Sequence, residues 1–365
     1  MTVVGRTGLP RLAVVADDLT GAADAAAPFA SRGAEVSLTL SGPPRGDVDV
    51  LALVSDSRWR EASDAANRVG QLVRQARDWG ADALFVKVDS TLRGNVRAEV
   101  GAALAAWGGA QAIAAPAFPA QGRVVRHGVL VVHGEPQPGS VAGCFPEGVS
   151  LLDAETDEEL DEIAERVLNE GAVAIGSAGL ARALADVILP GPPGPQGPRR
   201  PTGPVAGVLV VVGTAHLASR AQALALTGSG AVCVLVTQSA PVRIQEAVVA
   251  LARGGHVLVT TDIAHHVEAD TPGAAAVAAE LALVVQAITD AAPTAALVLT
   301  GGETALAVSR ALGARELRLL AEITPGIAIG ELVLADRSIP AITKSGGFGA
   351  RDALLQAVTT LEACA

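Results

Sequence analysis

The chain of 365 residues has few or none of several residue types on which whole classes of protein depend. Tyr is absent and aromatic residues make up 2% of the chain, although 50% of the residues are hydrophobic. A buried core must therefore be built from Ala, Val and Leu, a composition typical of helices packed on buried strands. The three cysteines, Cys144, Cys233 and Cys364, are odd in number and far apart, which argues against a disulfide framework and against CxxC metal sites.

Positive charge and long apolar runs are also scarce. The formal net charge is −11 and the pI is about 5.0, so we expect no nucleic acid partner, because phosphate contacts need clustered Lys and Arg. No uninterrupted apolar stretch approaches the roughly 18 residues of a membrane-spanning helix, and no basic region followed by a long apolar run opens the chain. We expect a cytoplasmic protein without a membrane partner, which could still bind a small anion locally.

Short apolar runs alternate with helical patterns along the first half of the chain. "LAVVA" (12–16) ends at Asp17, and the runs in "DVLALVSDSR" and "ADALFVKVDS" end near Asp56 and Asp89. Each run is followed by an Ala-rich or amphipathic helical pattern, which predicts parallel strands flanked by helices. Ligands of such folds bind beyond the carboxyl ends of the strands, where these polar clusters fall.

The composition changes abruptly at residues 190–205, "PGPPGPQGPRRPTGPV", which predicts an extended Pro/Gly linker. The alternation of strands and helices restarts after it. We therefore predict two α/β domains with mostly parallel sheets flanked by helices, 1–189 and 206–365, with the active site in the cleft between them.

Glycine-rich junctions follow three predicted strands of the second domain. Glycines let the backbone approach a ligand, and free N–H groups at a helix N-terminus suit phosphate. Each junction alone is better explained by a tight turn, but two double-glycine junctions, with Lys344 beside the second, predict a nucleotide phosphate site without a P-loop or GxGxxG motif. The predicted nucleotide-binding residues are Thr214, Gly301, Gly302, Glu303, Thr304, Lys344, Ser345, Gly346 and Gly347.

The first domain carries a different chemistry. Asp17 and Asp18 could chelate magnesium, accept hydrogen bonds from substrate hydroxyls or take a proton, or they could simply cap the following helix with Thr20. Arg58 could clamp a carboxylate or be a surface charge.

The stretch "KVDSTLRGN" (87–95) concentrates hydrogen-bonding groups. Lys87 and Asp89 fall on one face of the predicted strand, and a loop of Ser90, Thr91, Leu92 and Arg93 follows. Hydroxyls beside an arginine suit a small hydroxylated acid, with Arg93 against its carboxylate and Asp89 accepting from a hydroxyl. A polar turn that caps the next helix is the alternative.

Several motifs together resemble the four-carbon acid sugar kinase family, whose members act on threonate, erythronate or 3-oxo-tetronate. The resemblance reaches from residue 12 to about 355 and is carried by "ADDLTGAADAA", "KVDSTLRGN", "PAFPAQGRVVRHG", "GSAGLA", "GGETA", "EITPGIAIG" and "KSGGFGARD". It implies an N-terminal domain that binds the acid sugar through Asp17, Asp18, Arg58 and residues 90–93, and a C-terminal domain that binds ATP. The form "STLR" is closer to the threonate and erythronate branch.

The resemblance also implies the reaction. We expect phosphorylation of the terminal hydroxyl of an acid such as D-threonate or D-erythronate, with ATP and Mg²⁺ as cofactors, and a homodimer is compatible because family members are often dimeric. Asp18 is the first candidate for the catalytic base and Asp89 the second. The chain departs from the family at "GTAH" (213–216), where His216 replaces a small residue. A 3-oxo-tetronate kinase and a non-catalytic acid-sugar-binding protein stay open as alternatives.

Overall fold

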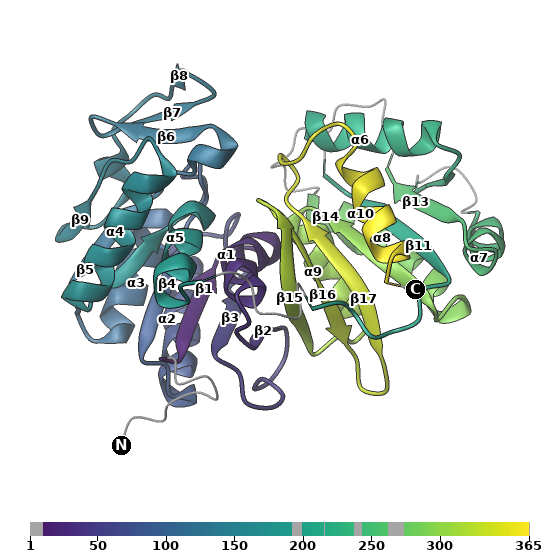
Figure 1. Ribbon diagram of the computed structural model, residues 1–365, viewed down its shortest axis with the longest axis horizontal. Coiled ribbons are helices and arrows are strands. Elements are labelled where there is room, and N and C mark those ends of the chain that lie inside the picture. The colour runs from purple at the N-terminus through teal and green to yellow at the C-terminus, as the bar shows by residue number, and fades with distance from the viewer. Residues whose placement is uncertain (1–9, 192–198, 215, 237–242, 262–273, 365) are drawn as a thin grey trace. The chain divides into compact units, whose positions relative to one another are not determined.

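The computed structural model describes residues 10–191, 199–214, 216–236, 243–261 and 274–364. The chain divides into two compact units, Met1–Pro198 and Arg199–Ala365 (Figure 1). The division falls inside the predicted linker, of which residues 192–198 lie outside the described residues.

The first unit is a parallel sheet with helices on both faces. Its strand order is β2-β3-β1-β4-β10-β5-β9. The strands are β1 (Leu12–Ala16), β2 (Val36–Thr39), β3 (Val50–Val54), β4 (Ala83–Lys87), β5 (Ala112–Ala115), β9 (Val149–Leu151) and β10 (Val173–Gly176). The helices are α1 (Leu19–Ser31), α2 (Ala62–Trp79), α3 (Val96–Trp107), α4 (Asp157–Glu170) and α5 (Ala178–Ile188). Helices α2 and α3 pair on one face, and α1, α5 and α4 lie together on the other (Figure 1).

Burial on both faces explains why these strands are continuous apolar runs. All five residues of β1 are buried, and the apolar side of α2 is formed by Ala65, Val69, Val73 and Ala76, which recur at helical spacing. A small antiparallel sheet of β6 (Arg123–Arg126), β7 (Val129–Val132) and β8 (Glu135–Pro136) is inserted after β5.

The second unit has the strand order β12-β13-β11-β14-β17-β16-β15. The strands are β11 (Gly207–Val212), β12 (Val232–Leu235), β13 (His256–Thr260), β14 (Ala295–Thr300), β15 (Glu316–Thr324), β16 (Ile327–Val333) and β17 (Ser338–Lys344). The helices are α6 (Leu217–Gly228), α7 (Ile244–Ala252), α8 (Ala274–Ala291), α9 (Gly302–Ala311) and α10 (Ala353–Glu362). The pairs that join β12, β13, β11, β14 and β17 are parallel, whereas β15 and β16 pair antiparallel at one side. The predicted α/β class with mostly parallel sheets is confirmed.

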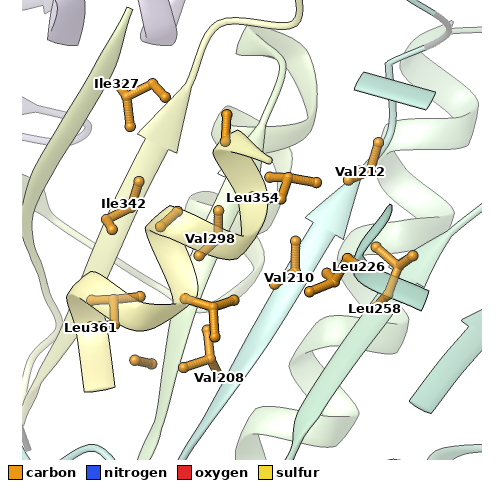
Figure 2. Packing of buried hydrophobic residues seen from close by; sticks show 14 of the residues in the cluster. Val208, Val210, Val212, Leu226, Leu258, Val298, Ile327, Ile342, Leu354 and Leu361 are labelled. Carbon is orange, nitrogen blue, oxygen red and sulfur yellow. The ribbon is translucent and has the colours of Figure 1, made fainter. Parts of the chain in front are cut away.

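Alternation along β11 builds the core of the second unit. Val208, Val210 and Val212 lie on one face of the sheet, where Leu226 of α6 and Leu354 of α10 pack against them (Figure 2). Helices α6 and α10 therefore share this face, while α8 and α9 pair on the other. Among the described residues, helix α8 is long and apolar enough to cross a membrane by length and composition. It contacts α7, α9 and β13, and its buried residues include Leu281, Val285 and Ile288.

Candidate functional site

In the first unit, the loops that follow three adjacent parallel strands meet at one edge of the sheet. The register pairs Ala16 of β1 with Val54 of β3 and with Lys87 of β4, so the residues after these positions emerge side by side. The loop after β1 contributes Asp17 and Asp18, the loop after β3 contributes Arg58, and the loop after β4 contributes Asp89. These side chains form the candidate sugar-acid site.

Arg58 holds the first loop. Its Nε and Nη2 donate to the two carboxylate oxygens of Asp17 at 2.6 and 2.7 Å, and its Nη1 donates to Asp18 Oδ2 at 2.9 Å. The Arg58 side chain is 13% exposed, so this forked pairing is largely shielded from water. Asp18 also caps α1, because its Oδ1 accepts from the Gly21 amide at 2.7 Å. Helix capping and the arginine contact are thus combined in one carboxylate.

Asp89 organises the loop after β4. Its Oδ2 accepts from the Thr91 amide at 3.0 Å and from Arg93 Nε at 3.0 Å, and its Oδ1 accepts from Arg93 Nη2 at 2.8 Å. Leu92 has a φ of 60°, a left-handed conformation uncommon for a side chain of this kind. The loop that the sequence singled out is therefore a strained turn built on a carboxylate.

Burial and opposite charge act against each other on these groups. Burial raises the pKa of Asp17, while its contact with Arg58 opposes that shift. Although burial works in the other direction, the hydrogen bond from Arg93 and the charge of Arg58 lower the pKa of Asp89 well below its ordinary value. Burial alone would lower the pKa of Arg58. The charges of Asp17 and Asp18 outweigh burial and raise this pKa well above its ordinary value.

Two further predicted residues lie inside the protein. Lys87 is buried, and its Nζ donates to the Val88 carbonyl at 2.8 Å. Ser90 is buried beside Asp89. Arg93 differs from all of these because its side chain is 46% exposed. Of the predicted cations in this unit, Arg93 is the one presented to solvent.

The sequence reasoning missed three residues that adjoin this site. Ser57 Oγ hydrogen bonds to Glu99 Oε1 of α3 at 2.6 Å, and Glu99 is buried. Arg123 of β6 is also buried, and its charge acts on both Asp89 and Arg93. Arg123 could have been predicted, because it lies in the stretch "PAFPAQGRVVRHG" that carries the family resemblance. Glu99 could not, because it resembles any acidic residue near the start of a helix.

In the second unit, the loops after β11, β14 and β17 also converge. An added Cβ at Gly346 would lie 2.8 Å from Thr214 Oγ1, and one at Gly301 would lie 3.3 Å from Thr214 Cβ. The Gly301 amide donates to the Lys344 carbonyl at 2.9 Å. A side chain at either position would crowd Thr214, so glycine lets the three loops approach each other closely. Gly301 has a φ of 92° and precedes α9, whose first turn contains Gly302, Glu303 and Thr304.

Lys344 supports the glycine loop from within. It is fully buried, and its Nζ donates to the carbonyls of Ser345 and Phe348, each at 2.9 Å. Burial lowers the pKa of Lys344 to about 7. Two residues that sequence reasoning missed brace the same loop: Ser219 Oγ donates to the Gly346 carbonyl at 2.6 Å, and Gln222 Nε2 donates to the Phe348, Gly349 and Ala350 carbonyls. The ammonium thus shapes the loop rather than projecting from it.

His216, the departure noted in the sequence, has a structural role. Its Nδ1 accepts from the Ala218 amide at 3.3 Å and so caps α6. Its Nε2 would lie 3.0 Å from an added Cβ at Gly347, so the imidazole packs against the glycine loop. Thr214 Oγ1 accepts from the His216 amide at 3.3 Å. Both side chains therefore adjoin the candidate phosphate loops.

Among the residues that the structure describes, no group of three or more His, Cys, Asp or Glu side chains could hold a metal ion. The acidic side chains of the first unit are instead engaged by arginines, as shown for Asp17 and Asp89. Any Mg²⁺ would have to be held mainly by ligands other than a preformed carboxylate cluster of these residues.

Comparisons with known proteins agree with this division of chemistry. Residues 12–143 match the family described as "Sugar-binding N-terminal domain", and residues 209–354 match the one described as "Nucleotide-binding C-terminal domain". A D-threonate kinase of Bordetella bronchiseptica is 35% identical, over 97% of this chain and 98% of its own length. A D-erythronate kinase of Heliobacterium modesticaldum is 26% identical, over 97% of each chain.

A crystal structure from Salmonella typhimurium LT2 has the same fold. It superposes with a TM-score of 0.72 at 19% identity, over 96% of this chain and 98% of the other. At that identity the likeness concerns the fold alone.

Proposed function

Because the chain belongs to the four-carbon acid sugar kinase family, we propose that it transfers the γ-phosphate of ATP to the terminal hydroxyl of D-threonate. The D-threonate kinase is more similar to the chain than the D-erythronate kinase, at 35% against 26% identity over nearly the whole length. D-Erythronate is the second candidate substrate, since the sequence itself does not separate the two stereoisomers.

The observation that carries the proposal is the gathering of two arginines and three aspartates at the carboxyl ends of β1, β3 and β4. A small hydroxylated acid needs a cation for its carboxylate and acceptors for its hydroxyls. Arg93 supplies an exposed cation, and Asp18 and Asp89 supply acceptors. The site thus contains both kinds of group within one cluster.

The glycine loops of the second unit fit the tail of a nucleotide. Gly301, Gly346 and Gly347 keep side chains away from the backbone where α9 begins and where β17 ends. Main-chain amides at such positions bind phosphate well, because the start of a helix carries a partial positive charge. We assign ATP to these loops, with Thr214, Glu303, Thr304, Lys344 and Ser345 around it.

Bound ATP with Mg²⁺ would supply the phosphoryl group and neutralise the negative charge that develops on it. The residues of this chain then have three tasks: to hold the acid, to hold the phosphates and to take the hydroxyl proton. Asp18 is our first candidate for the last task, because the lowered pKa of Asp89 makes that carboxylate a weak proton acceptor. That the two ligands meet between the units stays a prediction.

An assay of ADP release with D-threonate, D-erythronate and 3-oxo-tetronate tests the proposal. We expect the highest kcat/KM with D-threonate and no ADP release without an acid. A preference for 3-oxo-tetronate would move the chain to the other branch of the family. Failure to release ADP with any of the three acids, from protein whose circular dichroism shows a folded state, would overturn the proposed reaction.

A further inference from the structure

Behind the candidate sugar-acid site, a chain of hydrogen-bonding oxygen atoms runs from α3 to the end of β1. Glu99 Oε1 lies 2.6 Å from Ser57 Oγ, which lies 2.6 Å from Ser55 Oγ, which lies 3.0 Å from the Ala16 carbonyl oxygen. All three side chains are buried, with Glu99 only 4% exposed. The chain therefore ends on one side at a carboxyl group and on the other beside Asp17.

The number of hydrogens available to this chain is informative. Three oxygen–oxygen contacts need three hydrogens, and the Ala16 carbonyl can only accept. The hydroxyls of Ser55 and Ser57 supply two. The third contact is complete only when Glu99 carries a proton, since a protonated carboxyl has one O–H donor and an ionised one has none. The complete chain of contacts thus requires the neutral form of Glu99.

Burial and the charges around Glu99 set its pKa. Burial and the charge of Asp17 at the end of β1 raise the pKa of Glu99 to about 7, against the hydrogen bond with Ser57 and the charge of Arg58 after β3, which lower it. Helix α2 contributes Arg68, whose Nη1 donates to the Ser55 carbonyl at 3.3 Å, and β4 contributes Lys87, whose charge acts on Asp17. Glu99 is thus poised between its two protonation states at neutral pH.

Ser57 also connects Glu99 to the residues that bind substrate. Its amide donates to the Asp17 carbonyl at 3.2 Å, and its carbonyl accepts from Asn95 Nδ2 at 3.1 Å. The preceding residue, Asp56, has a φ of 53°, so the loop is held in a conformation that it would not favour alone. The hydrogen bonds that hold Ser57 in place therefore also restrict the position of the neighbouring Arg58.

We propose that Glu99 is a positioning residue whose proton completes the hydrogen-bonded chain behind Arg58, and that the enzyme takes up this proton when the sugar acid binds. The acid brings a negative charge to a cluster that already contains Asp17, Asp18 and Asp89. Like charges disfavour the ionised form of a neighbouring carboxyl, so binding shifts Glu99 toward its neutral form. By linkage, the acid binds more tightly as the pH falls through about 7.

This inference rests on the proposed function, since it needs a sugar acid in the first unit. The test is calorimetric titration of D-threonate into the whole protein at pH 7 without nucleotide, in two buffers of different ionisation enthalpy. Omitting nucleotide keeps the titration of Lys344 out of the measurement. We expect an uptake of a fraction of one proton per acid bound, which appears as a difference in heat between the buffers.

Two substitutions separate Glu99 from other buried carboxyls. Glu99→Gln supplies a permanent N–H donor in place of the acid proton, so we expect proton uptake to vanish and the KM for the acid to become independent of pH between 6 and 8. In the wild type the KM should rise with pH, by at most about tenfold per unit. The control is Glu331→Gln in the second unit, where an equally buried glutamate accepts from the Thr202 amide at 2.7 Å and where no effect on uptake is expected.

The outcomes distinguish the two proposals. If neither D-threonate nor D-erythronate gives a binding heat, the proposed function fails and this inference with it. If the acid binds with equal heat in both buffers, or if Glu99→Gln retains the uptake, the inference alone is overturned. Should Glu99→Gln not fold, Ser57→Ala replaces it: this variant breaks the hydrogen-bonded chain next to Glu99, so the pH range of the uptake should shift, and unchanged uptake would contradict the role of Glu99.

Discussion

At the scale of single residues, the candidate sugar-acid site has its charges already paired. Arg58 is bound by Asp17 and Asp18 and is 13% exposed, whereas Arg93 is bound by Asp89 and is 46% exposed. A substrate carboxylate that displaces a carboxylate from an arginine meets less resistance where the pair is open to water. From this difference we expect Arg93 to anchor the acid and Arg58 to hold the architecture of the site.

Replacing Arg93 with alanine tests that assignment. We expect the KM for the sugar acid to rise roughly 10- to 100-fold, since a hydrogen bond to a charged group contributes about 1.5 to 3 kcal/mol. The affinity for ATP should be unchanged. Steady-state kinetics with each ligand varied in turn provides the measurement. The control is Arg97→Ala, which removes a nearby exposed guanidinium whose Nη2 donates to the Gly143 carbonyl at 2.7 Å. Equal loss of acid and ATP affinity in Arg93→Ala would show that the loop is structural.

Asp18→Asn separates the proton acceptor from the helix cap. The amide oxygen of asparagine can still accept from the Gly21 amide, as Asp18 Oδ1 does at 2.7 Å, but it cannot take the hydroxyl proton. We therefore expect kcat to fall about 100- to 10,000-fold, with a much smaller change in the KM for ATP. Asp64→Asn, which removes an exposed carboxylate of α2, is the control. A kcat close to that of the wild type would transfer the role to Asp89.

At the scale of elements, one residue at the start of α1 both stabilises the helix and belongs to the candidate site: Asp18 caps α1 and accepts from Arg58. The Asp18 side chain caps this helix only because position 21 has no side chain: an added Cβ at Gly21 would collide with Asp18 Oδ1 and would lie 3.4 Å from Lys87 Nζ. Elsewhere within a helix alanine is preferred over glycine. Glycine is therefore needed at position 21 because the Asp18 carboxylate lies so close to it, and not because of its backbone conformation.

Gly21→Ala should consequently lower both the free energy of unfolding and the affinity for the sugar acid, because the cap must move away from Arg58. We expect a loss of about 1 to 2 kcal/mol, the usual contribution of a helix cap. Gly101→Ala in α3 is the matched control, since nothing lies within 4 Å of its added Cβ and the exchange should stabilise by roughly 0.5 to 1 kcal/mol. Urea denaturation of both variants measures the effect. If the two variants changed stability in the same direction, the steric argument would be wrong.

The elements also show how far the sequence alone could lead. The ends of β1, β3 and β4 were predictable because each apolar run stops at a polar cluster, and the parallel arrangement followed from the alternation with helices. Glu99 was not predictable, since only tertiary packing brings α3 against Ser57. Lys344 was noticed as a cation beside a glycine loop, but its burial depends on the register of β17 and the cover provided by α6. Sequence patterns thus located the loops, whereas the contacts of each side chain could be identified only from the three-dimensional structure.

At the scale of the whole molecule, each unit presents its loops at the carboxyl ends of its parallel strands. The first unit gathers charged side chains there, and the second gathers glycines and helix N-termini. A side-chain cluster suits a small acid whose charge is localised, whereas bare amides suit the spread charge of phosphates. Two sites of different chemistry, built on separate cores, should respond to their ligands separately.

Hydrogen–deuterium exchange of the whole protein tests this separation. D-Threonate alone should protect the amides of residues 17–21, 55–58 and 89–95, since we propose that the first unit holds the acid. A non-hydrolysable ATP analogue with Mg²⁺ should protect residues 301–304 and 344–349, because bound ligand suppresses local opening. Arg93→Ala should abolish the first pattern and leave the second, which also shows that this variant is folded. Protection of the glycine loops by the acid alone, or of residues 89–95 by the nucleotide alone, would contradict the assignment of one ligand to each unit.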